Sequence, residues 1–498
     1  MTVWRRAAGY SDPLFNYQAR MRGETGQMKT ALKLGYGLGQ TSSGVKNATF
    51  TIFLFFYYNQ VLGVSGSLVG MASLLALIVD AVTDPMVGQL SDRFKSRWGR
   101  RHPFMLLGAL PFGLTIYLLF APPAGLSEQG LFAWMLGFAI IVRVLLTFFY
   151  VPHLSLGAEM VRDYHERTVL IGYRQFCQFA GGLLVSMTGF IVFFPPSEAF
   201  PNGMLNAASY PGFAAFAGVL STVTMLWSIF STRSAIPYLS DPVPNPDARH
   251  PLLAFITVFR TLRQYAFRKL FITSLAFTTI VGLTQTLIIY TGAYLYGFTP
   301  EQLAVVASSP IIGVLLGPFT AKRLSIRFDK KKAFMICMVL GSIFGFSPPI
   351  AFLFGLIEPM AISERLGFVY LATGLSQIFF IALYIIVDSM LSDTIDQHEL
   401  DSGRREEGLF FAAGSLAQKA SFGFGAFAAG VGLDVIRFPR GASPAEVAAD
   451  ALQGLAMLSG PVSMVLLLSS LLIIRSYPIS QAEHAKISQR IQEMRSTA

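Results

Sequence analysis

Two carboxylates, Asp80 and Asp84, lie inside an apolar stretch near residues 67–90 that is long enough to enter a membrane. A carboxylate in hydrocarbon costs about 3 kcal/mol on insertion scales, so such residues commonly mark ion pathways. Their i, i+4 spacing places both acids on one helix face, one turn apart. Two acids at one depth can hold a cation or share a proton, and they titrate as a unit. The pair predicts a cation site in a transporter, with a structural pair bridged to a basic residue as the alternative.

Two basic residues also lie deep inside apolar stretches. Lys419 is too deep for its side chain to reach the surface easily, and its ammonium near the two acids could compete with a cation. Arg143 has Thr147 and Tyr150 at i+4 and i+7 on its own helix face. We expect Arg143 either to contact a solute or to form a buried ion pair, with Asp388 or with an acid of the first pair.

The composition around these groups is that of a polytopic membrane protein. Hydrophobic residues make up 53% of the 498 residues, charged residues make up 13%, and the mean hydropathy is +0.54, whereas a soluble domain is about 25% charged. The net charge of +10 comes from short loops between apolar stretches. Such placement sets membrane orientation, so no nucleic-acid partner is expected.

Twelve apolar stretches of about 20 residues can be placed as membrane-spanning helices. They lie near residues 34–62, 67–90, 104–122, 131–156, 169–194, 212–236, 269–296, 301–321, 333–356, 366–391, 408–434 and 452–475. The loops after the second and eighth stretches are rich in lysine and arginine, whereas the alternate loops hold only Arg365, Arg437 and Arg440. By the positive-inside rule both termini are cytoplasmic. The predicted fold class is an all-α membrane protein with twelve transmembrane helices.

The chain divides into two halves of six spans. Residues 237–268 begin as a polar, proline-containing run and end as a basic amphipathic segment, which predicts a cytosolic linker with a helix on the membrane surface. Charged motifs after spans 2 and 4 recur after spans 8 and 10, about 230 residues later, as expected for two parallel repeats. The predicted regions are a cytosolic N-terminal tail (1–33), an N-terminal six-helix bundle (34–236), the linker (237–268), a C-terminal six-helix bundle (269–475) and a cytosolic C-terminal tail (476–498).

Short motifs along most of the chain resemble the glycoside–pentoside–hexuronide:cation symporters, a branch of the major facilitator superfamily whose best-known member is the melibiose carrier. The motifs are residues 80–88 (DAVTDPMVG), 151–156 (VPHLSL), 392–396 (SDTID) and 403–408 (GRREEG), and the Gln418-Lys419 pair. The resemblance implies the major facilitator fold, in which two six-helix bundles expose a central site alternately to each side of the membrane.

In that family the paired acids of the second helix hold the coupling Na⁺, Li⁺ or H⁺. The resemblance carries this role to Asp80 and Asp84, with Thr83 at a neighbouring ligand position and Thr147 supplying a hydroxyl beside the cation. Lys419 matches a lysine that links the cation site to solute binding. Na⁺ needs several oxygen ligands, whereas proton coupling needs only the acids, so the sequence leaves the ion open.

The chain departs from the melibiose carrier at two sugar-binding acids, which lie on that carrier's first and fourth helices. Gly44 and Tyr150 occupy those positions here, and the first span offers Lys46 and Asn47 instead. A pocket that loses two acceptors for sugar hydroxyls and gains a cation suits an anionic solute, such as a hexuronide or a sulfonated sugar. Lys46 is expected either to contact the solute or to form a buried ion pair. The expected solute and coupling residues are Lys419, Lys46, Asn47, Arg143, Tyr150 and Gln418.

Charged residues at the cytosolic helix ends are expected to form gating or structural contacts rather than to bind solute. These gating residues are Asp92, Arg93, Arg100, Asp163, Glu166, Arg167, Asp393, Asp396 and Arg404. The sequence contains no H-E-x-x-H, P-loop or G-x-S-x-G motif and no Cys/His set with metal-ligand spacing, so an enzyme is not expected.

The whole sequence predicts a monomeric, multi-pass secondary symporter of the cell (inner or plasma) membrane. It would couple Na⁺ or H⁺ to a sugar or glycoside-type solute, with the solute, the cation and the lipid bilayer as partners and no cofactor. One charge moving through 100 mV supplies about 2.3 kcal/mol, enough for roughly 50-fold accumulation of a neutral solute. The alternatives are a Na⁺-coupled carrier of lysophospholipids or other amphiphiles with the same fold, and an uncoupled uniporter.

Overall fold

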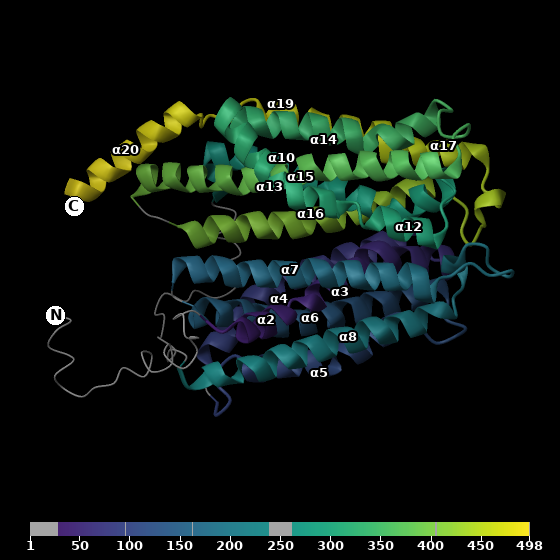
Figure 1. Ribbon diagram of the computed structural model, residues 1–498, viewed down its shortest axis with the longest axis horizontal. Coiled ribbons are helices and arrows are strands. Elements are labelled where there is room, and N and C mark those ends of the chain that lie inside the picture. The colour runs from purple at the N-terminus through teal and green to yellow at the C-terminus, as the bar shows by residue number, and fades with distance from the viewer. Residues whose placement is uncertain (1–27, 95, 162, 239–260, 404–405, 498) are drawn as a thin grey trace.

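The computed structural model describes residues 28–94, 96–161, 163–238, 261–403 and 406–497. Every regular element in these residues is a helix. The long helices run nearly parallel in two layers (Figure 1), with residues 30–238 in the lower layer and residues 261–497 in the upper one. We call these layers the N-terminal half and the C-terminal half.

The N-terminal half begins with a broken helical stretch that is followed by five long helices. Its elements are α2 (Thr30–Leu38), α3 (Thr41–Ala48), η2 (Thr49–Leu54), η3 (Tyr57–Val61), α4 (Gly66–Arg93), α5 (His102–Leu119), α6 (Glu128–Met160), α7 (Tyr164–Thr188), η4 (Gly189–Phe193), η5 (Gly203–Leu205), α8 (Ser209–Thr232) and η6 (Arg233–Tyr238).

The C-terminal half ends in an additional helix beyond its last apolar one. Its elements are η7 (Thr261–Arg263), α10 (Tyr265–Thr286), α11 (Ile288–Tyr290), η8 (Thr291–Leu295), α12 (Pro300–Ala307), α13 (Pro310–Phe328), α14 (Lys330–Leu353), α15 (Ile362–Ser402), α16 (Glu407–Val435), η9 (Pro444–Glu446), α17 (Ala449–Met457), η10 (Leu458–Val462), α18 (Ser463–Ser469), α19 (Leu471–Ile474) and α20 (Gln481–Thr497).

Side-chain caps set the starts of two helices that bear on the site. The Ser127 hydroxyl accepts a hydrogen bond from the Gly130 N–H at 3.2 Å at the start of α6. The Asp163 carboxylate accepts one from the Glu166 N–H at 2.9 Å at the start of α7. Each cap satisfies an N–H group that the first turn of a helix leaves unpaired. Asp163, predicted as a gating residue, thus has a capping role in this structure.

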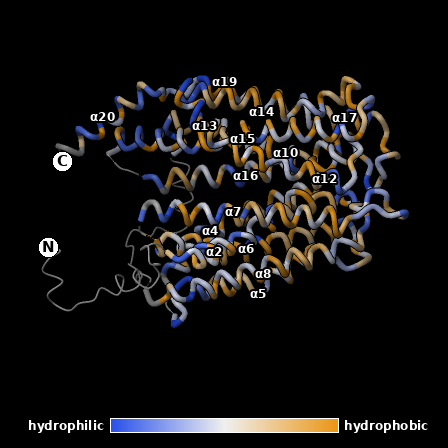
Figure 2. Tube along the Cα trace, viewed as in Figure 1, coloured by the Kyte–Doolittle hydropathy of each residue, from blue (hydrophilic) through white to orange (hydrophobic). Residues whose placement is uncertain are grey.

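Ten helical segments of the described residues are long and apolar enough to cross a membrane. Hydrophobic residues follow the length of these helices, and hydrophilic residues gather toward their two ends (Figure 2). The predicted spans 34–62 and 408–434 lie outside that set of ten but are helical too, as α2 to η3 and as α16. Helix α15 continues past the predicted span end at 391 to Ser402, because hydropathy marks only the part of a helix that lies in the membrane and not where the helix ends.

The two halves share an apolar core at one end of the molecule. We call the end that carries α20 the α20 end and the opposite one the far end (Figure 1). One buried cluster fills the N-terminal half and continues at the far end into the C-terminal half, through Tyr290, Leu295 and Phe438 among others. A second cluster fills the C-terminal half toward α20. The shared packing therefore lies at the far end.

Helices α4 and α16 approach each other closely along this shared end. A Cβ atom at Gly430 would lie 1.9 Å from the carbonyl oxygen of Gly66, and one at Gly70 would lie 2.6 Å from the Cα atom of Phe427. A side chain at either position would force the helices apart, since real Cβ atoms do not approach so closely. Glycine therefore permits the tight contact between the halves.

The polar regions that flank the two halves are described only in part. Most of the predicted N-terminal tail (1–33) and much of the predicted linker (237–268) lie outside the described residues. The predicted C-terminal tail (476–498) contains α20, whose Ile487 and Ile491 are buried against the C-terminal half. This tail is therefore docked on the bundle.

Candidate cation and solute site

A cavity of about 620 Å³ lies between the two halves, lined by residues from the middle of α4, α6 and α16 and from α3, η2, α7, α10 and α15. Its charged lining residues are Lys46, Asp80, Asp84, Arg143 and Lys419. All five are predicted from the sequence as cation, solute or coupling residues. At their usual ionisation three are positive and two are negative, so the formal charge of the cavity wall is positive.

Asp80 and Asp84 lie side by side on α4, as their spacing predicts, and share one hydroxyl from α6. The Thr147 Oγ1 atom is 3.1 Å from Asp80 Oδ1 and 2.8 Å from Asp84 Oδ1. A hydroxyl has a single hydrogen, so it can donate to only one of these carboxylates at a time. One oxygen of each carboxylate thus lies within hydrogen-bond distance of the same hydroxyl oxygen. Oxygen ligands of this kind suit a hard cation or a shared proton.

Lys419 reaches the same two acids from the other half of the molecule. Its ammonium donates a hydrogen bond to Asp84 Oδ2 and lies 3.4 Å from Asp80 Oδ2. The side chain comes from α16, so this ion pair joins the C-terminal half to the N-terminal half. Two monovalent cations about 4 Å apart repel by about 4 kcal/mol at an effective dielectric constant of 20. That is close to a thousandfold in affinity, so Lys419 and a bound cation exclude one another at these acids.

Arg143 and Lys46 occupy the wall beside the acids. Arg143 Nη1 is 3.5 Å from Asp80 Oδ2, so Arg143 pairs with an acid of α4 rather than with Asp388. Lys46 Nζ donates to Asn47 Oδ1 at 3.0 Å and has no carboxylate within 4.0 Å among the described residues. The Arg143 guanidinium and the Lys46 ammonium lie 5.2 Å and 5.8 Å from the centre of the Phe50 ring, within cation–π range. Arg143 therefore both forms an ion pair and faces the cavity.

The remaining predicted site residues fall into two groups. Asn47, Tyr150 and Gln418 line the cavity. Thr83 does not line it among the described residues, and its hydroxyl donates to the backbone carbonyl of Asp80 at 3.2 Å. Four of the lining residues that the sequence reasoning missed are polar or aromatic groups able to contact a solute, and a polar amide within an apolar stretch was a usable signal for two of them. These four are Phe50, Gln178, Gln285 and Tyr384.

The charged residues at the α20 end of the N-terminal half pair within that half. Arg100 and Arg101 both donate to Glu159 at the end of α6, and Arg101 Nη2 lies 3.3 Å from Asp92 Oδ1. Glu159 was not predicted, because acids near a helix end are common and carry little signal. These contacts hold the loop after α4 against α6.

Other predicted gating residues form contacts within the N-terminal half, lie at the surface, or fall outside the described residues. Glu166 Oε1 lies 3.7 Å from Lys33 Nζ, again within the N-terminal half, and Arg167 is exposed. The Arg93 side chain and the whole of Arg404 lie outside the described residues. The gating role of all these residues stays a prediction.

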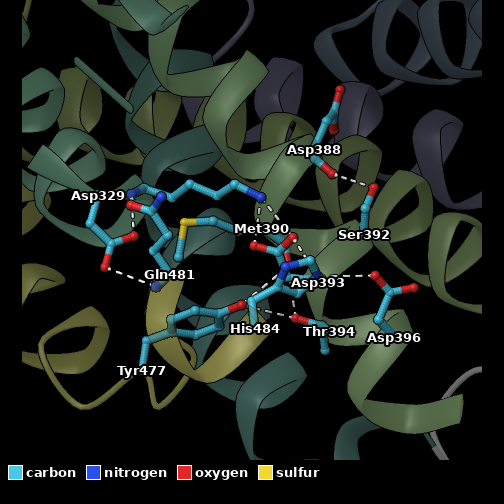
Figure 3. A network of polar contacts seen from close by, with 11 residues as sticks. Asp329, Asp388, Met390, Ser392, Asp393, Thr394, Asp396, Tyr477, Gln481 and His484 are labelled. Atoms are coloured by element: carbon cyan, nitrogen blue, oxygen red, sulfur yellow. Dashed lines mark hydrogen bonds and ion pairs between the residues drawn. The ribbon is translucent and has the colours of Figure 1, made fainter. Parts of the chain in front are cut away.

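A corresponding network lies at the α20 end of the C-terminal half (Figure 3). Asp393 accepts hydrogen bonds from Lys330 Nζ at 2.6 and 2.7 Å, and His484 Nε2 lies 3.0 Å from Asp396 Oδ2 and 3.4 Å from Asp393 Oδ1. Burial raises the pKa of Tyr477, so its hydroxyl stays protonated and donates to a backbone carbonyl of α15. The predicted gating acids Asp393 and Asp396 thus contact α14 and α20 of their own half.

At the far end, by contrast, polar contacts cross between the halves. Asp434 of α16 accepts hydrogen bonds from the N–H groups of Gly66 and Ser67 at 3.0 and 2.8 Å, which caps α4 from the opposite half. Arg440 Nη1 donates to the Gly63 carbonyl at 3.0 Å. The sequence analysis assigned no role to Asp434.

Tyrosines of the C-terminal half extend this contact. The Tyr290 hydroxyl donates to Asn59 Oδ1 at 2.6 Å, and the Tyr294 hydroxyl lies 3.3 Å from Gln60 Oε1. The Gln60 amide donates in turn to the Pro439 carbonyl at 3.2 Å. The far end is therefore closed by packing, by a helix cap and by side-chain hydrogen bonds.

Comparison with known proteins agrees with this architecture. The family described as "MFS/sugar transport protein" matches residues 35–481. The "Isoprimeverose transporter" of Lactiplantibacillus pentosus is 23% identical, over 80% of this chain and 79% of its own. The "Sodium-dependent lysophosphatidylcholine symporter 1" of Gallus gallus is 26% identical, over 99% and 94%.

Among solved structures, the inward open conformation of the xylose transporter XylE from E. coli has a TM-score of 0.56 at 15% identity. The match covers 91% of this chain and 95% of that one. A likeness at this identity supports the fold alone. The chain thus belongs to the MFS/sugar transport protein family, within its glycoside–pentoside–hexuronide:cation symporter branch, and is a multi-pass secondary transporter of the inner membrane rather than an enzyme.

Proposed function

We propose that this protein is a symporter that couples one Na⁺ or H⁺ to an anionic glycoside-type solute, such as a hexuronide. The observation that carries the proposal is the ion pair of Lys419 with Asp80 and Asp84, which joins the two halves inside a cavity whose wall is net positive. Placing a charged side chain deep in a membrane costs free energy, so such residues commonly mark a functional site.

The cation is proposed to bind where the oxygens of Asp80, Asp84 and Thr147 converge. Because the Lys419 ammonium already occupies these acids, a cation must displace it. The freed ammonium then faces the cavity together with Lys46. Binding of the cation thereby makes the Lys419 ammonium available to a negatively charged solute. The two binding events are therefore linked thermodynamically.

A negative solute is favoured because the wall has more positive than negative side chains even before a cation binds. Lys46 has no carboxylate partner among the described residues, and its ammonium lies on the cavity wall. A carboxylate or sulfonate would make charge-assisted hydrogen bonds with Lys46 and Lys419. Asn47, Tyr150 and Gln418 could then bind sugar hydroxyls.

Alternating access is proposed to proceed by rocking of the two halves. The segments 30–61 and 407–435 would join the ten long apolar helices to make twelve spans, with both termini in the cytosol by the positive-inside rule. The α20 end is then cytosolic and the closed far end faces outward. Opening would require breaking the contacts of Asp434, Asn59 and Gln60. One chain contains both halves and the whole cavity, so the transporter is proposed to act as a monomer.

A carrier of lysophospholipids remains a second candidate, since a relative that matches nearly the whole chain is named for that activity. Uptake into proteoliposomes decides between the two. The purified transporter would be given radiolabelled glucuronides, neutral glucosides and lysophosphatidylcholine, each with and without an inward Na⁺ or H⁺ gradient. We expect gradient-driven uptake of a glucuronide. Uptake of lysophosphatidylcholine alone, or uptake that ignores both gradients, would contradict the proposal.

A further inference from the structure

A second, smaller cavity of about 150 Å³ adjoins the central one. The two cavities share Ile52 of η2 and Gln285 of α10 in their walls. Most of the wall of the smaller cavity belongs to the C-terminal half, to α10, α12, α14 and α15. We call it the side pocket. No residue of the predicted cation or solute site lines it among the described residues.

The side pocket presents an apolar surface to a ligand. Its wall includes Phe298, Leu303, Val306 and Pro349. Its hydroxyl groups are mostly engaged within their own helices, since Thr284, Thr291 and Ser459 each donate to a backbone carbonyl one turn earlier. The wall also holds four polar side chains without such a bond among the described residues: Gln285, Tyr296, Thr373 and Gln377. The interior therefore offers mainly dispersion contacts, with a few groups that can bind a polar atom.

The backbone around the side pocket is irregular in a consistent way. The described residues contain five π-helical segments, and four of them contribute a wall residue. These are η2 with Ile52, η4 with Phe190, η8 with Thr291 and Gly292, and η10 with Ser459. π-Helical turns are uncommon and occur often at functional sites. The meeting of four such segments at one cavity suggests a binding role for the side pocket, and this argument does not depend on the volume of the pocket.

We propose that the side pocket binds one ring-sized apolar group of the solute while the charged sugar of that solute occupies the central cavity. An enclosed cavity of about 150 Å³ lined by Leu, Ile and Phe takes up a single benzene ring, and the side pocket has the same volume. This inference rests on the proposed function and narrows the solute class to glycosides with an aryl aglycone. A long acyl chain does not fit in a space that one ring fills.

Gln285 lies where the two parts of such a solute would join. Its side chain is half-buried on the shared wall and has no hydrogen-bond partner among the described residues. The amide can donate to a glycosidic oxygen or a neighbouring sugar hydroxyl. A polar group at the entrance and an apolar wall beyond it match a molecule that is polar at one end and aromatic at the other.

Binding of matched probes tests the side pocket directly. The dissociation constants of methyl and phenyl β-glucuronide, and of methyl and phenyl β-glucoside, would be measured by calorimetry on the full-length protein in detergent. Burying a phenyl ring should make the phenyl member of a pair bind about 10- to 100-fold more tightly than the methyl member. Equal binding of the two members by the wild-type protein would overturn the inference.

A variant that fills the side pocket tests its location. Ala307→Phe places a phenyl ring into the cavity from α12, whereas Val305→Phe adds the same ring on the same helix at a position that is 45% exposed. We expect Ala307→Phe to reduce the phenyl preference to about threefold or less while methyl glycoside binding persists, and Val305→Phe to keep the preference. Thr373→Phe, from the α15 wall, supplies a second filling variant if Ala307→Phe does not fold.

The outcomes separate the inference from the proposed function. A phenyl preference that survives both filling variants would overturn the side pocket as the aryl site. If the phenyl preference is found but glucuronide uptake ignores every cation gradient, the coupling proposal fails and the side pocket stands. If neither member of either pair binds, the proposed solute class fails and the inference fails with it.

Discussion

Asp80 and Asp84 share a single hydroxyl, so the contribution of that hydroxyl to cation binding can be measured. Thr147→Val removes the hydroxyl and keeps the shape of the side chain. A hydrogen bond to a charged group contributes about 1.5–3 kcal/mol, so we expect the apparent affinity for the coupling cation to fall about 10- to 100-fold. The cation dependence of uptake in proteoliposomes gives this number.

Thr83→Val is the matched control for that experiment. The Thr83 hydroxyl donates to a carbonyl of its own helix rather than to a carboxylate, so its loss should change cation affinity by less than about threefold. An equal loss of affinity in both variants would show that the convergence at Thr147 does not define the cation site.

A second prediction concerns Lys419, which is proposed to couple binding of the cation to binding of the solute. Lys419→Met keeps an unbranched side chain of nearly the same length and removes its charge. The acids then bind a cation without displacing an ammonium, so we expect solute affinity to become nearly independent of Na⁺ or H⁺. Calorimetry measures the solute affinity with and without the cation. The ratio of these two affinities should fall from more than about tenfold in the wild-type protein to about one in the variant. Lys46→Met, the control, should weaken solute binding but leave the ratio above about fivefold.

The sequence could predict these residues because a charge inside an apolar stretch is a strong signal. Asp80, Asp84, Arg143 and Lys419 all lie on the central cavity. Asp434 could not be predicted in this way, because it is near a helix end, where charges are common, and its partners are backbone N–H groups of a distant helix.

At the scale of helices, the cap that α16 places on α4 should control opening of the far end. Asp434→Asn removes the negative charge beside the N-terminus of α4 and weakens two hydrogen bonds. Such charge–dipole contacts contribute about 0.3–2 kcal/mol, so we expect the outward-open state to become roughly 2- to 30-fold more populated.

Labelling of a cysteine in the cavity measures that shift. Ser415 lines the cavity and is exposed, and both native cysteines, Cys177 and Cys337, are buried. In a Ser415→Cys background, Asp434→Asn should speed labelling by an impermeant maleimide added from the far side. An unchanged rate would indicate that Asp434 does not hold this end closed, and the rate from the α20 side serves as the control.

The sequence predicted the long helices but not the irregular turns within them. Runs of apolar residues predicted each long helix, because the helix must satisfy its own backbone in the membrane. They did not predict the break between α2 and α3 or the π-helical segments η2 and η8. These irregularities depend on packing between helices that are distant in sequence. The docking of α20 through His484 was missed for the same reason.

At the scale of the whole molecule, the single pair of acids predicts the charge moved per cycle. One monovalent cation carried with a singly negative solute moves no net charge, so a membrane potential alone should not drive accumulation. A tenfold cation gradient supplies about 1.4 kcal/mol, enough for about tenfold accumulation at any potential. Uptake of a glucuronide under an imposed potassium–valinomycin potential, compared with uptake under a Na⁺ or H⁺ gradient, measures this. Accumulation driven by potential alone would indicate an additional cation.

The architecture of two halves was predictable from the recurrence of charged motifs, whereas their relative placement was not. Closure at the far end depends on glycine contacts such as Gly66 with Gly430 and on the Tyr290–Asn59 hydrogen bond. Neither contact follows from local sequence, because each joins segments more than 230 residues apart. The side pocket likewise arises from four helical irregularities that meet only in the folded molecule.

The central claim is that Asp80 and Asp84 are kept in the membrane because a coupling cation binds them. Gradient-driven uptake by Asp84→Asn, of a solute that the wild-type protein concentrates, tests it most directly. The amide cannot hold the charge of the cation, so the account predicts that the internal concentration rises to the external one and no further. Accumulation by Asp84→Asn to the wild-type level under the same Na⁺ or H⁺ gradient would contradict the account.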